Sequence, residues 1–424
     1  MRAAPLALRV SAAIAGVASL APYTAVAGDV LPVTSCADDG SPGTLRSVAA
    51  QAAPDTTIDL SGLTCSTITL EQGAIQPAGG VFTLRGPGMD RLMIDGNGLD
   101  RVLKGTKVTI EGLTLAHGRI SGDGASGGCV EALTGVVLRG SRVTGCSVDG
   151  GQGAGGGGLS ARDYAAIYDS VVSDNIVSAS SFLAWGGGIV SDRITVDHSW
   201  IIGNGATGVG SRGGGIYAGG VADILYSTID DNSADYGGGG FCGWTPNGIC
   251  LVSNSTISGN TAYRSGGGWL VADNNVYVGN STIAFNVAEA GVVGGVLVRG
   301  NFYGGVVQSS IIADNTAGDR SLSVDLDTDE AIPPEIIGNS NLLTEVGRLD
   351  PGHIIADPRL APLAAYGGPT PTHALAPDSP AIDGGTNFSA LDTDQRGRSR
   401  VSGAAADIGA YELQTDMIFA NGFD

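Results

Sequence analysis

The sequence has few basic residues, few aromatic residues and very few histidines, and each shortage narrows the range of functions. Its 424 residues include 22 Lys and Arg against 42 Asp and Glu, so the formal net charge is −20. Nucleic acids and anionic membranes require a basic surface, so neither is an expected partner. The charge also disfavours a polyanionic substrate unless calcium bridges the two. Aromatic residues make up only 5 % of the chain, which argues against many extended stacking platforms for sugars.

Motifs for common metal and nucleophile chemistry are also missing. The histidines His117, His198, His353 and His373 are scattered and form no zinc-binding pattern such as HExxH. No Gly-x-Ser-x-Gly elbow lies between a strand and a helix, because the glycine runs fall in strands and turns, and no glycine loop opens a helix for phosphate. The acidic run 325–330 begins like a calcium loop, but glutamate stands where an EF-hand requires glycine. We predict no metal and no cofactor, although so acidic a surface could attract calcium ions adventitiously.

Beyond its first residues the sequence has no apolar run long enough to span a membrane. The first residues themselves have the character of a secretory signal. Arg2 and Arg9 are basic, residues 10–20 are apolar, and the chain then reaches the small-residue pattern Ala25-Val26-Ala27. We expect cleavage after Ala27 and a soluble chain that is secreted or held at the outer surface.

Six cysteines in an exported chain predict three disulfide bonds, because no CxxC pair suggests a metal site and the compartment is oxidising. Proximity in the sequence favours Cys36 with Cys65, Cys129 with Cys146, and Cys242 with Cys250. The last pair has the clearest support, because the insert 243–249 between the two sulfurs is easily closed at its base. For the other four cysteines the sequence leaves the pairing open.

A short motif recurs through the middle of the chain and predicts the architecture. The clearest copies are STIDDN at 227–232, STISGN at 255–260 and STIAFN at 281–286. Other copies begin at Ser141, Ser170, Ser199 and Ser310, and a degenerate copy begins at Leu113. Successive starts are 28, 29, 29, 28, 28, 26 and 29 residues apart. Such a period is typical of stacked repeats, none of which can bury its apolar face alone.

Each repeat contains short extended runs separated by glycine and asparagine, with no helical periodicity. Alternation places β-branched residues inward at Val143, Val172, Ile201, Ile229, Ile257, Ile283 and Ile312. We predict an all-β fold, a right-handed parallel β-helix (a pectate-lyase-like solenoid) with a short N-terminal capping helix. Coils spaced by about 4.8 Å would extend eight repeats over roughly 40 Å.

Reading the repeats in columns assigns directions to their side chains. The sixth motif position predicts a ladder of stacked amides at Asn175, Asn204, Asn232, Asn260, Asn286 and Asn315. The column after the glycine clusters predicts core residues at Leu159, Ile189, Ile216, Phe241, Trp269 and Val296. The second motif position predicts solvent-facing residues at Arg142, Val171, Trp200, Thr228, Thr256, Thr282 and Ile311. Trp200 is therefore the expected exposed aromatic residue.

Composition divides the chain into five segments. They are a signal peptide at 1–27, a cap with the first coils at 28–112, repeats at 113–334, a Pro- and Gly-rich C-terminal capping region at 335–413 and a tail at 414–424. In the first cap, Leu45, Val48, Ala49 and Ala52 share one helical face after a possible N-cap at Thr44. Strands are expected at 57–60, 67–70, 82–85, 92–95 and 108–115. The C-terminal region is expected to cover the last coil.

The C-terminal region resembles a known family in its motifs. DP at 357–358, GGPTPTH at 367–373, SPAIDGG at 379–385, TDQRG at 393–397 and DIGAYE at 407–412 resemble the choice-of-anchor Q domain. Segment 36–46 is similar to the CSLREA-type N-terminal region, although its cysteine does not directly precede the leucine. The resemblance is to bacterial exported β-helix proteins of the polymorphic outer membrane protein kind. It implies export through a Sec signal and surface anchoring by varied means, and it implies no shared catalytic activity. The end of the tail, 417–424, looks like a short terminal motif of other secreted Gram-negative proteins.

Some enzymes also have a parallel β-helix fold. The aspartates of the repeats therefore have two possible interpretations, catalytic residues or turn residues. Asp174, Asp231 and Asp314 share the fifth motif position, with Asp230 beside the second of them. Asp174 and Asp231 would lie two coils apart, about 9.6 Å, which suits the carboxylate pair of an inverting glycoside hydrolase. Aspartate beside a ladder asparagine is equally ordinary in turns, and we prefer that structural interpretation.

Two further clusters have the same ambiguity. Asp197-His198 is similar to part of a pectate lyase stretch, but no calcium-binding aspartate set accompanies it. Asp394, Arg396 and Arg400 could form an acid–base cluster or a hydrogen-bonded capping loop. We prefer the structural interpretation for both clusters, and we predict no catalytic residue.

The predicted function is that of an exported surface or secreted protein with a structural, adhesive or carbohydrate-recognition role. Recognition would use the solvent columns and the inserted loops 178–186 and 241–250. The expected partner is an extracellular polysaccharide or a host or cell surface, and the expected oligomeric state is a monomer. The alternative is an extracellular polysaccharide lyase or glycoside hydrolase on a β-helix scaffold.

Overall fold

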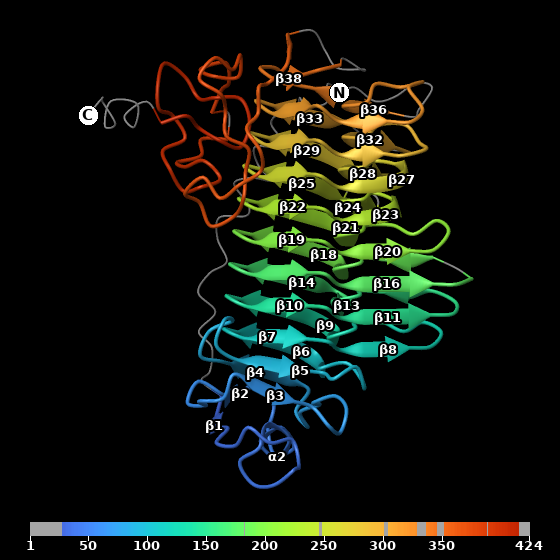
Figure 1. The fold of residues 1–424 in the computed structure, drawn as a ribbon, viewed down its shortest axis with the longest axis vertical. Helices are drawn as coiled ribbons and strands as arrows, with labels where there is room; N and C mark the ends of the chain where they lie inside the picture. Colours follow the sequence, from blue (N-terminus) through green and yellow to red (C-terminus); the bar gives the residue numbers. More distant parts are fainter. Residues whose placement is uncertain are drawn as a thin grey trace, which may run out of the picture.

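The chain winds as a right-handed parallel β-helix in which each coil pairs with the next, as Figure 1 shows. This computed structural model describes residues 28–181, 183–245, 248–300, 304–328, 336–345, 352–387 and 389–414. The predicted signal peptide and its cleavage site after Ala27 lie outside the described residues, as does the tail from residue 415. The predicted fold class is confirmed.

Three long sheets run along the solenoid. The 12-stranded sheet, called the motif sheet here, takes the middle of each motif copy and contains β3 (Thr67–Thr69), β5 (Met93–Asp95), β7 (Thr114–Ala116), β10 (Arg142–Thr144), β15 (Val171–Ser173), β19 (Trp200–Ile202), β22 (Thr228–Asp230), β26 (Thr256–Ser258), β30 (Thr282–Ala284), β34 (Ile311–Ala313), β38 (Leu342–Leu343) and β39 (Ile354–Ile355). The eight-stranded sheet contains β8 (Arg119–Ser121), β11 (Ser147–Gly150), β16 (Ile176–Ala179), β20 (Gly205–Thr207), β23 (Ser233–Tyr236), β27 (Thr261–Ser265), β31 (Val287–Ala288) and β35 (Thr316–Ala317).

The third sheet is called the wide sheet, because one long strand in some coils is replaced by two shorter strands in others. Its 17 strands are β1 (Val30–Pro32), β2 (Thr56–Asp59), β4 (Val81–Arg85), β6 (Leu103–Glu111), β9 (Val130–Arg139), β13 (Leu159–Ala161), β14 (Tyr164–Tyr168), β18 (Ile189–Asp197), β21 (Ile216–Leu225), β24 (Gly240–Gly243), β25 (Ile249–Ser253), β28 (Trp269–Ala272), β29 (Asn275–Gly279), β32 (Val296–Arg299), β33 (Gly305–Gln308), β36 (Leu326–Thr328) and β37 (Ile336–Ile337). A two-stranded pair is formed by β12 (Ala154–Gly155) and β17 (Ala184–Trp185).

The strands of the motif sheet are short because a left-handed residue stands on each side of them. The residue before the motif serine has positive φ at Asp169, His198, Tyr226, Asn254, Asn280 and Ser309. The fifth motif residue has positive φ at Asp174, Gly203, Asp231, Gly259, Phe285 and Asp314. Glycine, asparagine and aspartate adopt this conformation at the least cost, which explains their recurrence at these two corners.

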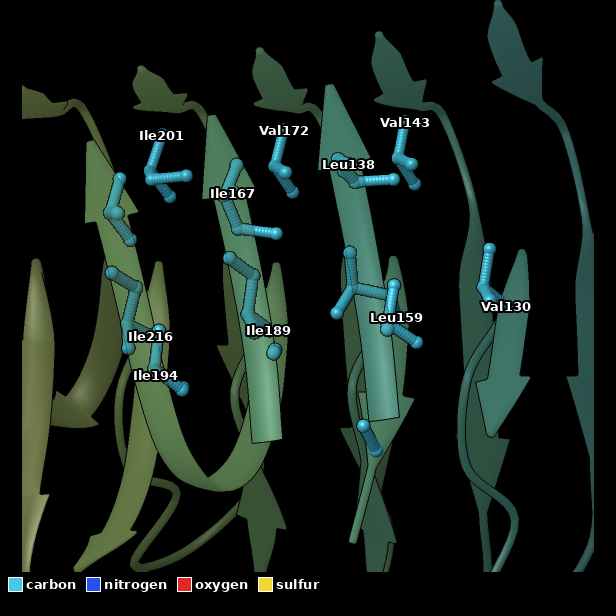
Figure 2. Packing of buried hydrophobic residues seen from close by; sticks show 14 of the residues in the cluster. Val130, Leu138, Val143, Leu159, Ile167, Val172, Ile189, Ile194, Ile201 and Ile216 are labelled. Carbon is cyan, nitrogen blue, oxygen red and sulfur yellow. The ribbon is translucent and has the colours of Figure 1, made fainter. Parts of the chain in front are cut away.

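Inside the coils, equivalent apolar residues lie directly over one another. Val143, Val172 and Ile201 are paired in register along the motif sheet and are fully buried. Figure 2 shows this row beside a second one from the wide sheet, which includes Leu159 and Ile189. The predicted inward direction of the β-branched residues is confirmed, and their stacking builds one core along the solenoid.

One residue of the predicted core column, Phe241, is buried as expected but belongs to a neighbouring column. The register pairs Ile216 with Gly240 and Gly240 with Trp269, so Phe241 belongs to the neighbouring column that faces outward. Trp269 is fully buried in the core. A Cβ atom at position 240 would overlap the indole of Trp269. The glycine therefore makes room for a large side chain, which shifts the apolar pattern by one residue in this coil.

The six motif asparagines form a continuous ladder. Each side-chain amide donates to the Oδ1 atom of the next asparagine over 2.9–3.0 Å, from Asn175 through Asn286 to Asn315. Asn315 donates in turn to Asp325, which also accepts from Thr344. Because these amides are buried, each bond that is lost would leave a polar group without a partner.

A second ladder, which the sequence analysis did not single out, uses the motif serines. The backbone N–H of Ser170 donates to the hydroxyl of Ser199, and that of Ser199 donates to the hydroxyl of Ser227, both over 3.0 Å. The pattern continues to Ser310. The first and sixth motif residues thus stabilise opposite ends of the strands β15, β19, β22, β26, β30 and β34.

All three predicted disulfide bonds are present, and the predicted pairing is confirmed: Cys36–Cys65, Cys129–Cys146 and Cys242–Cys250. The Cys129–Cys146 bond joins two positions of the coil that also contact each other in the next coil. In the next coil Gly158 lies against the ladder residue Asn175, close enough that a Cβ atom would touch its amide. Cys129 and Cys146 hold those same two positions one coil earlier, where the backbone N–H of Cys146 donates to Asn175 Oδ1 over 3.0 Å and begins the ladder.

The N-terminal end begins with the predicted helix. Helix α2 spans Leu45–Ala49 and Thr44 is its N-cap, accepting from the backbone N–H of Ser47 over 3.2 Å. The strand expected at 108–115 is two strands, β6 and β7. They are separated at Gly112, whose φ of 62° turns the chain.

The C-terminal region lies on the side of the solenoid, against the motif sheet between β22 and β34, and this corrects its expected place over the last coil (Figure 1). Gln395 donates to Thr228 and contacts Thr256, and His373 contacts Ser258 over 2.8 Å. Residues of two motifs that carry the family resemblance, His373 and Gln395, therefore contact the solenoid directly.

This docking also corrects part of the predicted solvent-facing column. Thr228, Thr256, Thr282 and Ile311 are fully buried beneath the C-terminal region. Arg142, Val171 and Trp200, in earlier coils, remain partly exposed. The alternation correctly placed these residues outside the coil, but the C-terminal region covers four of the seven.

Candidate functional site

Two outward-facing columns meet at a glycine-rich bend and form a concave corner. The first column contains Trp185, Arg212 and Tyr236, which are linked by successive backbone bridges. The second contains Tyr217 and Phe241, which are paired in register in the wide sheet. Residues 213–215, between the two columns, are all glycine and project no side chain into the corner. The rings of both columns can therefore approach one another.

The side chains in this corner form a continuous set of ring contacts. Tyr217 stacks on Phe241 with centroids 5.1 Å apart and planes at 5°, and Phe241 stacks on Trp244 at 5.9 Å. Trp185 meets Tyr217 at 6.4 Å with tilted planes. The guanidinium carbon of Arg212 lies 5.0 Å from the centroid of Trp244 and 5.5 Å from that of Phe241. Such contacts fix the orientation of the rings.

Beside these rings is a cavity, called the aromatic slot here. Its volume is about 400 Å³, within the range of pockets that hold small ligands. Its walls combine rings and aliphatic groups with a few charged groups, and they are formed by Arg212, Tyr236, Phe241, Trp244, Leu270, Ala272, Asp273, Arg299 and Gly300. Walls that mix aromatic and aliphatic groups with charged groups suit a ligand that has both an apolar face and polar edges.

The position of Trp244 depends on the third disulfide bond. In the β-sheet, Cys242 is in register with Ala218 of the preceding coil, and Cys250 is in register with Ala222. The strands of the two coils are therefore paired both before and after the insert. The disulfide closes the base of that insert and the indole projects from it. Trp244 is 50 % exposed.

Trp244 was not among the predicted site residues, and Trp200, the predicted exposed aromatic residue, is only partly exposed. Two signals would have pointed to Trp244. It lies within a disulfide-closed insert, and it lies in the loop 241–250 that was expected to carry recognition.

The fifth-position aspartates do not lie in the slot. Asp174, Asp231 and Asp314 all occupy left-handed corners of the coil, which favours the turn interpretation over a catalytic pair. Burial, together with the neighbouring charge of Asp231, raises the pKa of Asp230 to about 6. Burial also raises the pKa of Asp314. These shifts are those of carboxyls held at the surface of a packed solenoid.

His198 likewise belongs to a corner column. Its Nδ1 atom lies 2.7 Å from Asp197 Oδ1, and its ring stacks on Tyr226 with centroids 4.8 Å apart. The hydrogen bond to Asp197 raises the pKa of the imidazole. These contacts satisfy the side chain without any substrate and favour its structural interpretation.

The predicted cluster Asp394, Arg396 and Arg400 is buried between the C-terminal region and the solenoid. Arg396 is paired with Asp394 at 2.6 Å, and Arg400 is paired with Glu412 at 3.0 Å. Arg400 also donates to Asn254 of the solenoid over 3.1 Å. Because all of these side chains are withdrawn from solvent, the cluster holds the C-terminal region in place.

A second, more open hollow of about 850 Å³ lies between the C-terminal region and the later coils. Charged groups at its wall already have partners: Arg320 pairs with Glu345 at 2.6 Å, and Arg359 pairs with Asp378. The aromatic ring that lines the hollow belongs to Phe285, and it packs against the buried His373 with centroids 5.1 Å apart. The aromatic slot is therefore the stronger candidate site.

In the described part of the chain, no group of three or more His, Cys, Asp or Glu side chains is placed to hold a metal ion. No described helix combines the length and apolar character needed to cross a membrane.

Comparison with known proteins gives one structural likeness. No protein-family model matches the sequence, and no curated protein matches it. A solved structure described as the crystal structure of pectate lyase Pel9A is 13 % identical, with a TM-score of 0.43 and coverage of 91 % of this chain and 96 % of that chain. At this level of similarity nothing about activity passes to this chain.

Proposed function

We propose that this protein is an exported β-helix protein that recognises carbohydrate through the aromatic slot and acts as an adhesive or structural component outside the cell. The observation that carries the proposal is the slot itself. It places the half-exposed ring of Trp244 beside Phe241 and within reach of the charged groups Asp273 and Arg299. The C–H face of a sugar ring is apolar and packs on an aromatic ring, while its hydroxyls form hydrogen bonds at the edge.

Export and surface location are supported by the disulfide bonds and by the resemblance to choice-of-anchor Q proteins. Disulfides persist in oxidising compartments, and all six cysteines are paired. The motifs of that resemblance supply docking contacts such as those of His373 and Gln395. They are thus accounted for without catalysis. The corner positions of Asp174 and Asp231 further support recognition over cleavage.

The test is a binding measurement on a panel of neutral and uronate polysaccharides, with the mature chain immobilised. We expect at least one polysaccharide to bind, and we expect Trp244→Ala to abolish that binding because the stacking surface is lost. Tyr263→Ala is the matched control, since Tyr263 is 56 % exposed and lies outside the slot. Equal loss in both variants, or no binding to any member of the panel, would contradict the proposal.

The same panel tests the alternative of an enzyme. New reducing ends or unsaturated products, absent after Asp174→Asn or Asp231→Asn, would show cleavage and replace the proposal.

A further inference from the structure

The aromatic slot has the opposite sign of charge from the chain as a whole. Among its lining residues, Arg212 and Arg299 are basic and Asp273 is acidic, so two positive charges against one negative leave an excess of one positive charge. Arg264, next to the slot, is neutralised by Asp235 at 3.3 Å. The whole chain carries −20. A local excess of positive charge in so acidic a chain suggests that the slot interacts with a negatively charged group.

Arg212 is the group through which this charge can act on a ligand. Its guanidinium makes no hydrogen bond or ion pair with any residue that the structure describes, and its ring contacts are with Phe241 and Trp244. An arginine that lies over aromatic rings keeps its N–H groups available at the edge of its plane. Two of these N–H groups match the two oxygens of a carboxylate in a bidentate pair.

We propose that the slot binds an acidic saccharide, with a sugar carboxylate on Arg212 and the apolar face of the same sugar on Trp244. This rests on the proposed function and adds the class of ligand. The net charge of the chain predicts poor binding of polyanions, but that expectation sums charges over the whole molecule. At physiological ionic strength, charges more than about 8 Å away are largely screened. The charged groups that line the slot therefore determine which sign of ligand charge it favours.

The experiment compares ligands that differ only in charge. Tetrasaccharides of galacturonate and of mannuronate are prepared as free acids and as methyl esters, and binding to the full mature chain is measured by calorimetry. We expect at least one free acid to bind about tenfold or more tightly than its ester, because a charge-assisted bidentate pair is lost on esterification. Arg212→Gln is expected to bring the affinity for the acid down to that for the ester in the same variant, so that the preference for the acid is lost.

Three comparisons make the result decisive. Arg119→Gln removes an equally basic side chain far from the slot and is expected to change neither affinity. Arg212→Lys keeps the charge without the planar fork and is expected to retain only part of the preference, which separates a charge effect from misfolding. Trp244→Ala is expected to weaken the acid and the ester alike.

The outcomes also separate this inference from the one on which it rests. Equal affinity for the acid and the ester, or an equal loss of both in Arg212→Gln, would overturn the acidic ligand while leaving sugar recognition in place. Failure of every acid, every ester and every neutral polysaccharide to bind would overturn both.

Discussion

The outward column of the motif sheet divides into two regions with different surroundings. Arg142, Val171 and Trp200 lie on earlier coils and stay partly exposed, whereas Thr256 and Thr282 on later coils are fully buried. Three of the later coils have threonine at this position, and each threonine hydroxyl contacts the C-terminal region, whereas the coil of β34 has the apolar Ile311. The comparison shows that the alternation of apolar and polar residues predicts which side chains face out of a coil. It does not predict whether an outward side chain meets solvent or a docked segment.

The largest effect is expected from removing a buried charge beneath the docked region. Arg400→Met should destabilise docking by about 3–5 kcal/mol, because Glu412 would be left buried without its partner. Hydrogen exchange at the amides of Gly409 and Ala410, which bond to the solenoid, measures that docking. Arg142→Met is the control in the exposed region. Its ion pair with Asp90 is at the surface, so we expect a change of at most about 1 kcal/mol. Equal effects would remove the distinction between the two regions.

The next effect should be the same in both regions, because the asparagine ladder runs beneath both. Asn204→Ala and Asn260→Ala each remove the acceptor of two N–H groups, and each is expected to destabilise the fold by about 2–4 kcal/mol. The replaced amides make equivalent bonds to their neighbours. Urea unfolding followed by circular dichroism measures the loss. A large cost at only one of the two sites would show that docking also supports the interior of the coil.

A smaller effect tests the hydroxyl itself. Thr256→Val keeps the shape of the side chain but removes its contacts with Gln395 and Thr372, and is expected to cost about 1–2 kcal/mol. Val171→Thr makes the reverse exchange in the exposed region and is expected to change stability by less than about 0.5 kcal/mol. The same urea experiment compares them. Destabilisation of similar size at both sites would mean that strand propensity, and not docking, selects threonine.

The smallest effect concerns pH. Burial raises the pKa of Glu412 to about 7, even though Arg400 favours the ionised form and Asp407 lies nearby. A raised pKa means that the docked state holds the proton more tightly, so its stabilisation is complete below the ordinary value of 4.5 and is lost as the pH rises through about 7. We expect a change on the order of 1 kcal/mol, because Arg400, paired with Glu412 at 3.0 Å, favours the ionised form and offsets part of the cost of burying it. Exchange at Gly409 between pH 4.5 and 7 should therefore become faster than the intrinsic pH dependence predicts. Glu412→Gln should remove that excess, and an unchanged excess would assign it to Asp407 or another group.

Much of the candidate site could not be predicted from the sequence. Phe241 was assigned to the core because it follows a glycine cluster, and only the register with Trp269 shows that Gly240 takes the inward place. Trp185, Arg212 and Tyr217 have no pattern of their own in the sequence. They meet because three glycines bend the chain between two columns. Sequence spacing describes one coil at a time, and the slot is built from several.

By itself the sequence determined the coil. The 26–29-residue period set the stacking. Asn204 and its equivalents marked the ladder, and the spacing of Cys242 and Cys250 marked the clipped insert, because each of these features repeats or closes within neighbouring coils. Only the tertiary structure decided that the C-terminal region lies on the flank and that Arg212 lies over Trp244. Those contacts join residues whose separation in the chain follows no period. Their free energy depends on the shapes and geometry of the two partners, so no local sequence pattern predicts them.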